Sequence, residues 1–174
     1  SFVNYVMTDV YYFHQGIEFG IDANIVGGLN VNAVAAWGQH LYNSRPIAEV
    51  YRDNSAEKID SAKTVYIRNY KIGGMPQSAG SIGLKYNGKG YWFASLNFNM
   101  FFDIYLDPSP DRRTESAVEG FTTSDPQWNE AIDQVKLNDG AGFVNYNLNI
   151  MGGKSFKFGD YFLSLFANIS NLTN

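Results

Sequence analysis

Residues 92–104 read WFASLNFNMFFDI, and this stretch decides the fold. Apolar side chains occupy every second position from Trp92 onward, while Ser95, Asn97 and Asn99 lie between them. A period of two is typical of a β-strand that has one apolar and one polar face. The run is longer than the roughly 5–6 residues of an ordinary strand. It reaches the roughly 9–11 residues that a strand needs to cross a membrane.

The same alternation returns along the chain. It runs through residues 17–25, 29–37, 144–150 and 161–169, and more weakly through 82–86. Asn, Ser, Gly or charged residues occupy most of the positions between the apolar ones. We therefore predict an antiparallel sheet with strands near residues 12–26, 29–42, 76–86, 91–106, 143–158 and 161–172, and residues 2–10 are a candidate seventh strand.

Short and long connections alternate between these strands. Residues 26–28, 87–90 and 159–160 have the glycines of tight turns, whereas residues 43–70 and 107–142 are long and polar. Outer-membrane barrels sort their connections in this way, with short periplasmic turns and long extracellular loops. The sequence thus predicts an all-β fold, an antiparallel transmembrane β-barrel.

Composition excludes several classes of protein and site. The chain of 174 residues has no cysteine, so it has no disulfide and no zinc site built from thiolates. A net charge of −4 argues against a nucleic-acid surface. Aromatic residues make up 16% and charged residues only 17%, which is unusual for a soluble protein. No apolar run reaches the roughly 20 residues of a membrane helix, which leaves strands as the means of crossing a membrane.

The alternation also assigns side chains to faces. Lys154 falls on the lipid side, although a bulge at Gly152-Gly153 would reverse its face. Candidates for the lumen side are Glu18, Asp22, Asn97, Asn99, Asp103 and Asn147. Candidates for an aromatic girdle at the membrane boundary are Trp37, Tyr91, Trp92, Tyr105 and Tyr161.

Residues 107–142 form the longest connection, and long loops are usually functional or disordered. We predict that it lies outside the cell and takes part in ligand capture or in closing the barrel mouth. The candidate ligand residues are Asp111, Arg112, Arg113, Glu115 and Trp128. Two alternatives stay open: a calcium site that includes Asp107, and arginines that only pin the loop.

Other motifs give weaker signals. Asp53, Glu57 and Asp60 predict a solvated face on a short helix over residues 56–62. His14 and His40, the only histidines, are expected to be hydrogen-bonded or interfacial rather than metal ligands. No Ser-His-Asp set is visible. We therefore expect no enzyme, no cofactor and no bound metal.

Five stretches carry a family resemblance: residues 16–18, 73–77, 102–114, 153–156 and 168–172. They read GIE, GGMPQ, FDIYLDPSPDRRT, GKSF and NISNL, and the third is the most specific. With them, nearly the whole chain resembles the C-terminal β-barrel of TonB-dependent outer-membrane receptors of the Bacteroidota type. The resemblance implies that residues 1–174 are part of a barrel of about 22 strands.

The resemblance further implies active transport across the outer membrane. Such a receptor captures an iron chelate, cobalamin, a glycan or a peptide outside the cell and imports it with energy from TonB. Its partners are outer-membrane lipid, the TonB complex through a plug region, and in some cases a surface lipoprotein. The plug and the final strands of the family are not in this sequence, so we expect a longer protein. The alternatives are a smaller outer-membrane or surface β-protein with a passive role, and a barrel-embedded hydrolase that uses His14 or His40.

Overall fold

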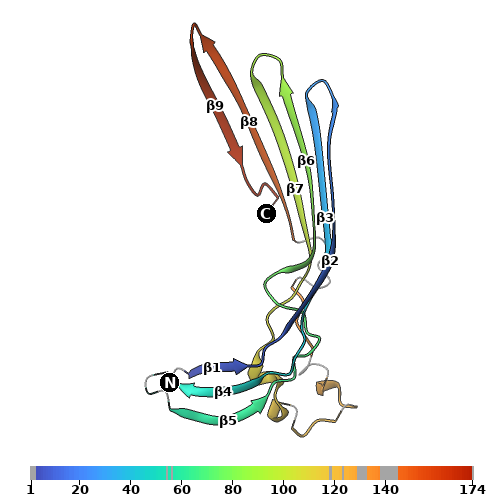
Figure 1. The fold of residues 1–174 in the computed structure, drawn as a ribbon, viewed down its shortest axis with the longest axis vertical. Helices are drawn as coiled ribbons and strands as arrows, with labels where there is room; N and C mark the ends of the chain where they lie inside the picture. Colours follow the sequence, from blue (N-terminus) through green and yellow to red (C-terminus); the bar gives the residue numbers. More distant parts are fainter. Residues whose placement is uncertain are drawn as a thin grey trace. The chain divides into compact units, whose positions relative to one another are not determined.

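The structure, a computed structural model, consists of two antiparallel sheets (Figure 1). It describes residues 3–53, 55, 57–117, 119–122, 124–128, 133–137 and 145–173. The chain divides into two compact units, which we call the sheet unit (residues 16–38, 76–103 and 138–174) and the loop unit (residues 1–15, 39–75 and 104–137). No helix in the described part of the chain is long and apolar enough to span a membrane.

Six long strands in the order β2-β3-β6-β7-β8-β9 form the larger sheet. Their bounds are β2 Tyr12–Val26, β3 Leu29–Tyr42, β6 Pro76–Gly88, β7 Trp92–Ile104, β8 Tyr146–Phe158 and β9 Tyr161–Ile169. All six predicted strands are confirmed, β2 and β3 with the predicted ends and the other four with ends shifted by a few residues. Residues 143 and 144, the predicted start of the fifth, lie outside the described residues. The three predicted tight turns are also confirmed, and they join β2 to β3, β6 to β7 and β8 to β9 at one end of this sheet (Figure 1).

Strand register places most of the apolar side chains on one side, which we call the apolar face. Phe98 of β7 pairs with Leu148 of β8, and Lys154 of β8 pairs with Leu165 of β9. Directly paired residues point to the same side of a sheet. The register runs without a shift past Gly152, so no bulge reverses the face of Lys154. Lys154 therefore lies on the same face as Leu165 and Leu148, as the alternation predicts, and the bulge alternative is wrong.

The opposite side, the polar face, carries hydrogen-bonded amides. Asn99 Nδ2 donates to Asn147 Oδ1 at 2.8 Å, and Asn149 Nδ2 donates to the same oxygen at 3.1 Å. Asn97 pairs with Asn149 in register, and its Nδ2 donates to Ser81 Oγ at 3.3 Å. We call Asn97, Asn99, Asn147 and Asn149 the asparagine cluster. It links β6, β7 and β8 by side-chain bonds, which satisfies polar groups that lie side by side.

The loop unit contains a three-stranded sheet in the order β1-β4-β5. Its elements are β1 Val3–Thr8, β4 Ile47–Arg52 and β5 Lys58–Thr64, with the 3₁₀ helices η1 Pro110–Arg113 and η2 Glu115–Ala117. The candidate seventh strand is thus confirmed as a strand, β1, but it belongs to this smaller sheet and not to the six-stranded one. The core of the unit is small and consists of Tyr42, Ala48, Val65 and Ile67.

The predicted helix over residues 56–62 is wrong, because residues 58–64 form β5. The helical spacing of Glu57 and Asp60 is a weak local preference, and strand pairing overrides it. Ile47 of β4 pairs with Thr64, which satisfies backbone groups that a helix would satisfy internally. The expected solvated charges are present, since Arg52 pairs with Glu57 at 3.5 Å and Lys63 with Asp60 at 2.5 Å.

The turn between β2 and β3 gives a first testable prediction. Gly28 has φ +94°, and an added Cβ would collide with the backbone carbonyl oxygen of Asn87. Gly28→Ala should therefore lower the free energy of unfolding by about 1–3 kcal/mol, measured by urea titration.

Gly20 is the matched control, because no atom lies within 4 Å of its Cβ position and its φ is not positive. Gly20→Ala should change the same free energy by less than about 1 kcal/mol. Equal destabilisation by the two variants would contradict the proposed origin of the effect.

Candidate functional site

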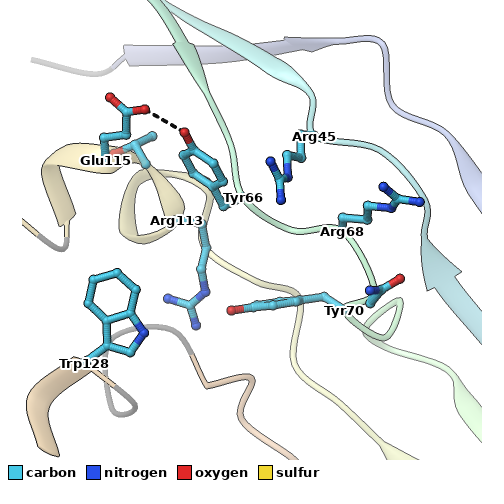
Figure 2. A pocket seen from close by; sticks show the side chains of 9 residues that line it. Arg45, Tyr66, Arg68, Tyr70, Arg113, Glu115 and Trp128 are labelled. Carbon is cyan, nitrogen blue, oxygen red and sulfur yellow. Dashed lines mark hydrogen bonds between the residues drawn. The ribbon is translucent and has the colours of Figure 1, made fainter. Parts of the chain in front are cut away.

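A cavity of about 590 Å³ lies within the loop unit, and its wall combines arginines with aromatic rings (Figure 2). Two stretches of chain supply the wall, and both are long connections between strands of the larger sheet. The connection from β3 to β6 supplies Arg45, Tyr66, Arg68, Asn69 and Tyr70. The connection from β7 to β8 supplies Arg113, Thr114, Glu115 and Trp128.

A short extended segment places the first set of side chains. Val65 and Ile67 are buried in the core of the loop unit, at 0% and 1% exposure. Tyr66 and Arg68 alternate with them, so their side chains point away from that core and into the cavity wall. The amide of Val65 donates to the carbonyl of Pro46 at 2.8 Å, which holds the segment in place.

Arg113 holds the second set in place. Its side chain is buried, and its guanidinium donates to the carbonyls of Arg112 at 3.0 Å and Asp133 at 2.8 Å. The same guanidinium lies 5.4 Å from the ring centre of Tyr70, within the range of a cation–π contact. This geometry favours the interpretation in which Arg113 pins the loop.

Backbone and side-chain bonds join the two connections to each other. The amide group of Gln134 accepts from Lys71 N at 2.7 Å and donates to Lys71 O at 2.5 Å, as a neighbouring strand would. The amide of Tyr66 donates to the carbonyl of Arg113 at 2.7 Å. The shape of the cavity therefore depends on both connections at once.

Charge in the cavity wall is mainly positive. The described residues of the wall include three arginines, Arg45, Arg68 and Arg113, and one carboxylate, that of Glu115, although the whole chain has a net charge of −4. Glu115 accepts a hydrogen bond of 2.6 Å from the hydroxyl of Tyr66, and this bond raises the pKa of Tyr66. Among the described residues, neither Arg45 nor Arg68 forms an ion pair.

Three of the five predicted ligand residues line the cavity, namely Arg113, Glu115 and Trp128. The other two, Asp111 and Arg112, are exposed and lie outside its wall. Burial raises the pKa of Tyr5, and the negative charge of Asp111 raises the pKa of this tyrosine further. The cavity residues of the first connection were not predicted from the sequence: Arg45, Tyr66, Arg68, Asn69 and Tyr70. A short period-two pattern around Val65 and Ile67 was the available signal.

The calcium alternative finds no support in the described residues, where no three His, Asp or Glu side chains gather closely enough to hold a metal. Asp107 has another role, because its Oδ1 accepts from the amide of Gly73 at 3.0 Å and from the hydroxyl of Tyr42 at 3.4 Å. His14 and His40 form a hydrogen bond of 2.9 Å between their Nδ1 atoms.

The residues assigned to the lumen and the girdle take these positions. Asn97, Asn99 and Asn147 share the polar face in register, and Glu18 and Asp22 are exposed on β2. Asp103 has φ +54°, which interrupts the regular alternation of β7, so counting by two does not assign its face. Tyr91, Trp92 and Tyr161 lie at the short-turn end of the sheet, Trp37 lies toward the other end of β3, and Tyr105 lies just beyond β7.

In comparisons with protein families, curated proteins and solved structures, nothing matches this chain.

The role of Arg113 can be tested by its removal. Arg113→Met deletes the bonds to the carbonyls of Arg112 and Asp133, so local opening of residues 105–137 should become easier by about 1.5–3 kcal/mol. Hydrogen exchange at residues 112–117 and 133–137 measures this change, and limited proteolysis should show faster cleavage.

Arg112→Met is the control, because Arg112 is the neighbouring arginine in η1 and its side chain is exposed. It should leave exchange and cleavage nearly unchanged. Equal acceleration in both variants would mean that positive charge, rather than the bonds of Arg113, orders the loop.

Proposed function

We propose that the six-stranded sheet is part of the wall of a transmembrane β-barrel in an outer membrane. The exposed apolar face carries this proposal. Ile17, Phe19 and Leu165 expose 71%, 66% and 59% of their surface. Contiguous apolar surface of this kind marks a contact with lipid or protein. Strands of 13 to 15 residues in β2, β3, β6, β7 and β8 are long enough to cross a bilayer.

The polar face supports the same proposal. An amide is costly in hydrocarbon, whereas the interior of a large membrane barrel is polar and wet. The asparagine cluster on β7 and β8 lies opposite the apolar side chains, as a lumen wall requires. A soluble sandwich would bury one face of each sheet against another sheet and would not need strands of this length.

The barrel that we propose has more strands than these six. Membrane barrels of bacteria have at least about 8 strands. The resemblance to TonB-dependent receptors sets the expectation at about 22, with further strands pairing along β2 and β9. In that arrangement the sequence forms one arc of the wall, and a plug domain fills the lumen.

The cavity supports a role as a receptor. Both connections that form it leave the sheet at the strand ends remote from the short turns. In outer-membrane barrels the long connections are extracellular. We therefore propose that the protein binds a scarce ligand outside the cell and imports it with energy supplied through TonB.

The barrel proposal predicts opposite environments for neighbouring residues. The chain has no cysteine, so nitroxide labels can be attached one at a time at Phe98, Leu165, Asn97 and Asn147. In lipid vesicles, labels at Phe98 and Leu165 should collide mainly with oxygen. Labels at Asn97 and Asn147 should collide mainly with a water-soluble nickel complex. Equal aqueous access at all four sites would refute the assignment.

The transport proposal predicts a loss of uptake without a loss of insertion. A strain that lacks the gene is first screened on single sources of carbon, iron and cobalamin to find the nutrient that needs the protein. Deletion of residues 119–135, which removes Trp128 and the Asp133 carbonyl bound by Arg113, should abolish growth on it. Removal of TonB should have the same effect on growth while surface binding persists. Growth that needs neither the loop nor TonB would favour a passive barrel.

A further inference from the structure

We infer that the cavity of the loop unit binds a small acidic ligand in which a carboxylate is attached to a ring, either a flat aromatic ring or a sugar ring, that packs against aromatic side chains. This inference deepens the proposed function and rests on it for the source of the ligand, outside the cell. The chemistry of the cavity wall carries it.

Two arginines in the wall are available to a ligand. Arg45 and Arg68 have exposed side chains and form no ion pair with any described carboxylate. A guanidinium presents a fork of donors that matches a carboxylate with two parallel hydrogen bonds. Arg45 is already ordered, because it lies 5.3 Å from the ring centre of Tyr66. Such ordering reduces the entropy lost when a ligand binds.

The other charged groups of the wall have structural partners. Arg113 donates to two backbone carbonyls, and Glu115 accepts from the hydroxyl of Tyr66. The carboxylate that would otherwise attract a cation is thus engaged, and the positive charge of the wall stays in excess. A neutral or cationic ligand would leave Arg45 and Arg68 without anionic partners.

Aromatic rings supply the second half of the binding chemistry. Tyr66, Tyr70 and Trp128 come from both connections and surround the cavity (Figure 2). Ring faces of this kind stack on flat rings, and rings combined with arginines hold planar anions well. A volume of about 590 Å³ lies within the range of small-molecule sites, roughly 300–1,000 Å³. The ligand is therefore a small molecule rather than a protein surface.

Two kinds of molecule offer this chemistry, an aromatic acid and a sugar acid. Isothermal titration of the full-length protein in detergent can separate them with four probes: phthalate, its neutral diamide, galacturonate and galactose. At least one acid should bind about tenfold or more tightly than its neutral partner. Phthalate alone would indicate an aromatic ligand, and galacturonate alone a sugar acid.

Variants connect the binding to the cavity. Arg45→Gln and Arg68→Gln should each weaken acid binding about tenfold, because each removes a charged hydrogen-bond donor. Both side chains are exposed, so both variants should fold. Arg112→Gln removes an exposed arginine outside the cavity wall and should leave the affinity unchanged. Arg68→Lys keeps the positive charge but lacks the forked donors of a guanidinium. Its affinity for the acid should therefore lie between those of the wild type and Arg68→Gln.

Several outcomes would overturn the inference: equal binding of acids and their neutral partners, binding of no probe, or an equal effect of Arg112→Gln. Labels at Phe98 and Asn97 are read on the same protein after transfer to vesicles. Correct insertion without acid binding would overturn the inference and leave the barrel proposal standing. Acid binding by a protein that does not insert would overturn the barrel proposal and leave the inference standing.

Discussion

The pairing of β7 with β8 is the constraint on which the rest of the sheet depends. A slip of β8 by one residue against β7 would move Leu148 to the polar face and bring Asn149 to the apolar one. The bonds of the asparagine cluster exist only in the observed register, because they join specific partners across strands. Apolar contacts on one side and amide bonds on the other thus specify the same register of β7 and β8. Because β9 pairs with β8, its side chains are assigned to the same two faces.

The long strands could be predicted from sequence because their alternation persists over many residues and tight turns mark their ends. The start and end of β2 and β3 agree with the expectation at every terminus. The short strands were harder. β4 and β5 have only six and seven residues, and their pairing includes register shifts. No long period-two run in the sequence therefore indicates these two strands. Irregular backbone also limits the assignment of side chains to the apolar or polar face. Asp103 in β7 is an example, because its positive φ interrupts the alternation.

The cavity could be predicted only in part. Arg113, Glu115 and Trp128 stood out as charged or aromatic residues in a long loop, but their partners lie far away in sequence. Tyr66 and Glu115 are separated by 49 positions, and Lys71 and Gln134 by 63. A local pattern contains no information about such pairs, which arise when two connections fold against each other. The same limit explains why Arg112 and Arg113, neighbours with the same chemistry, end in different environments.

The bonds between the two connections have a consequence for dynamics. Arg113 holds a carbonyl of one connection while its guanidinium lies near the ring of Tyr70 from the other, and Gln134 binds both backbone groups of Lys71. Neither connection can open far without breaking bonds that order the other, so the two should open and close as one cooperative unit. A molecule that binds in the cavity would then stabilise both connections together. Occupancy of the cavity would therefore change the order of both connections and not of one alone.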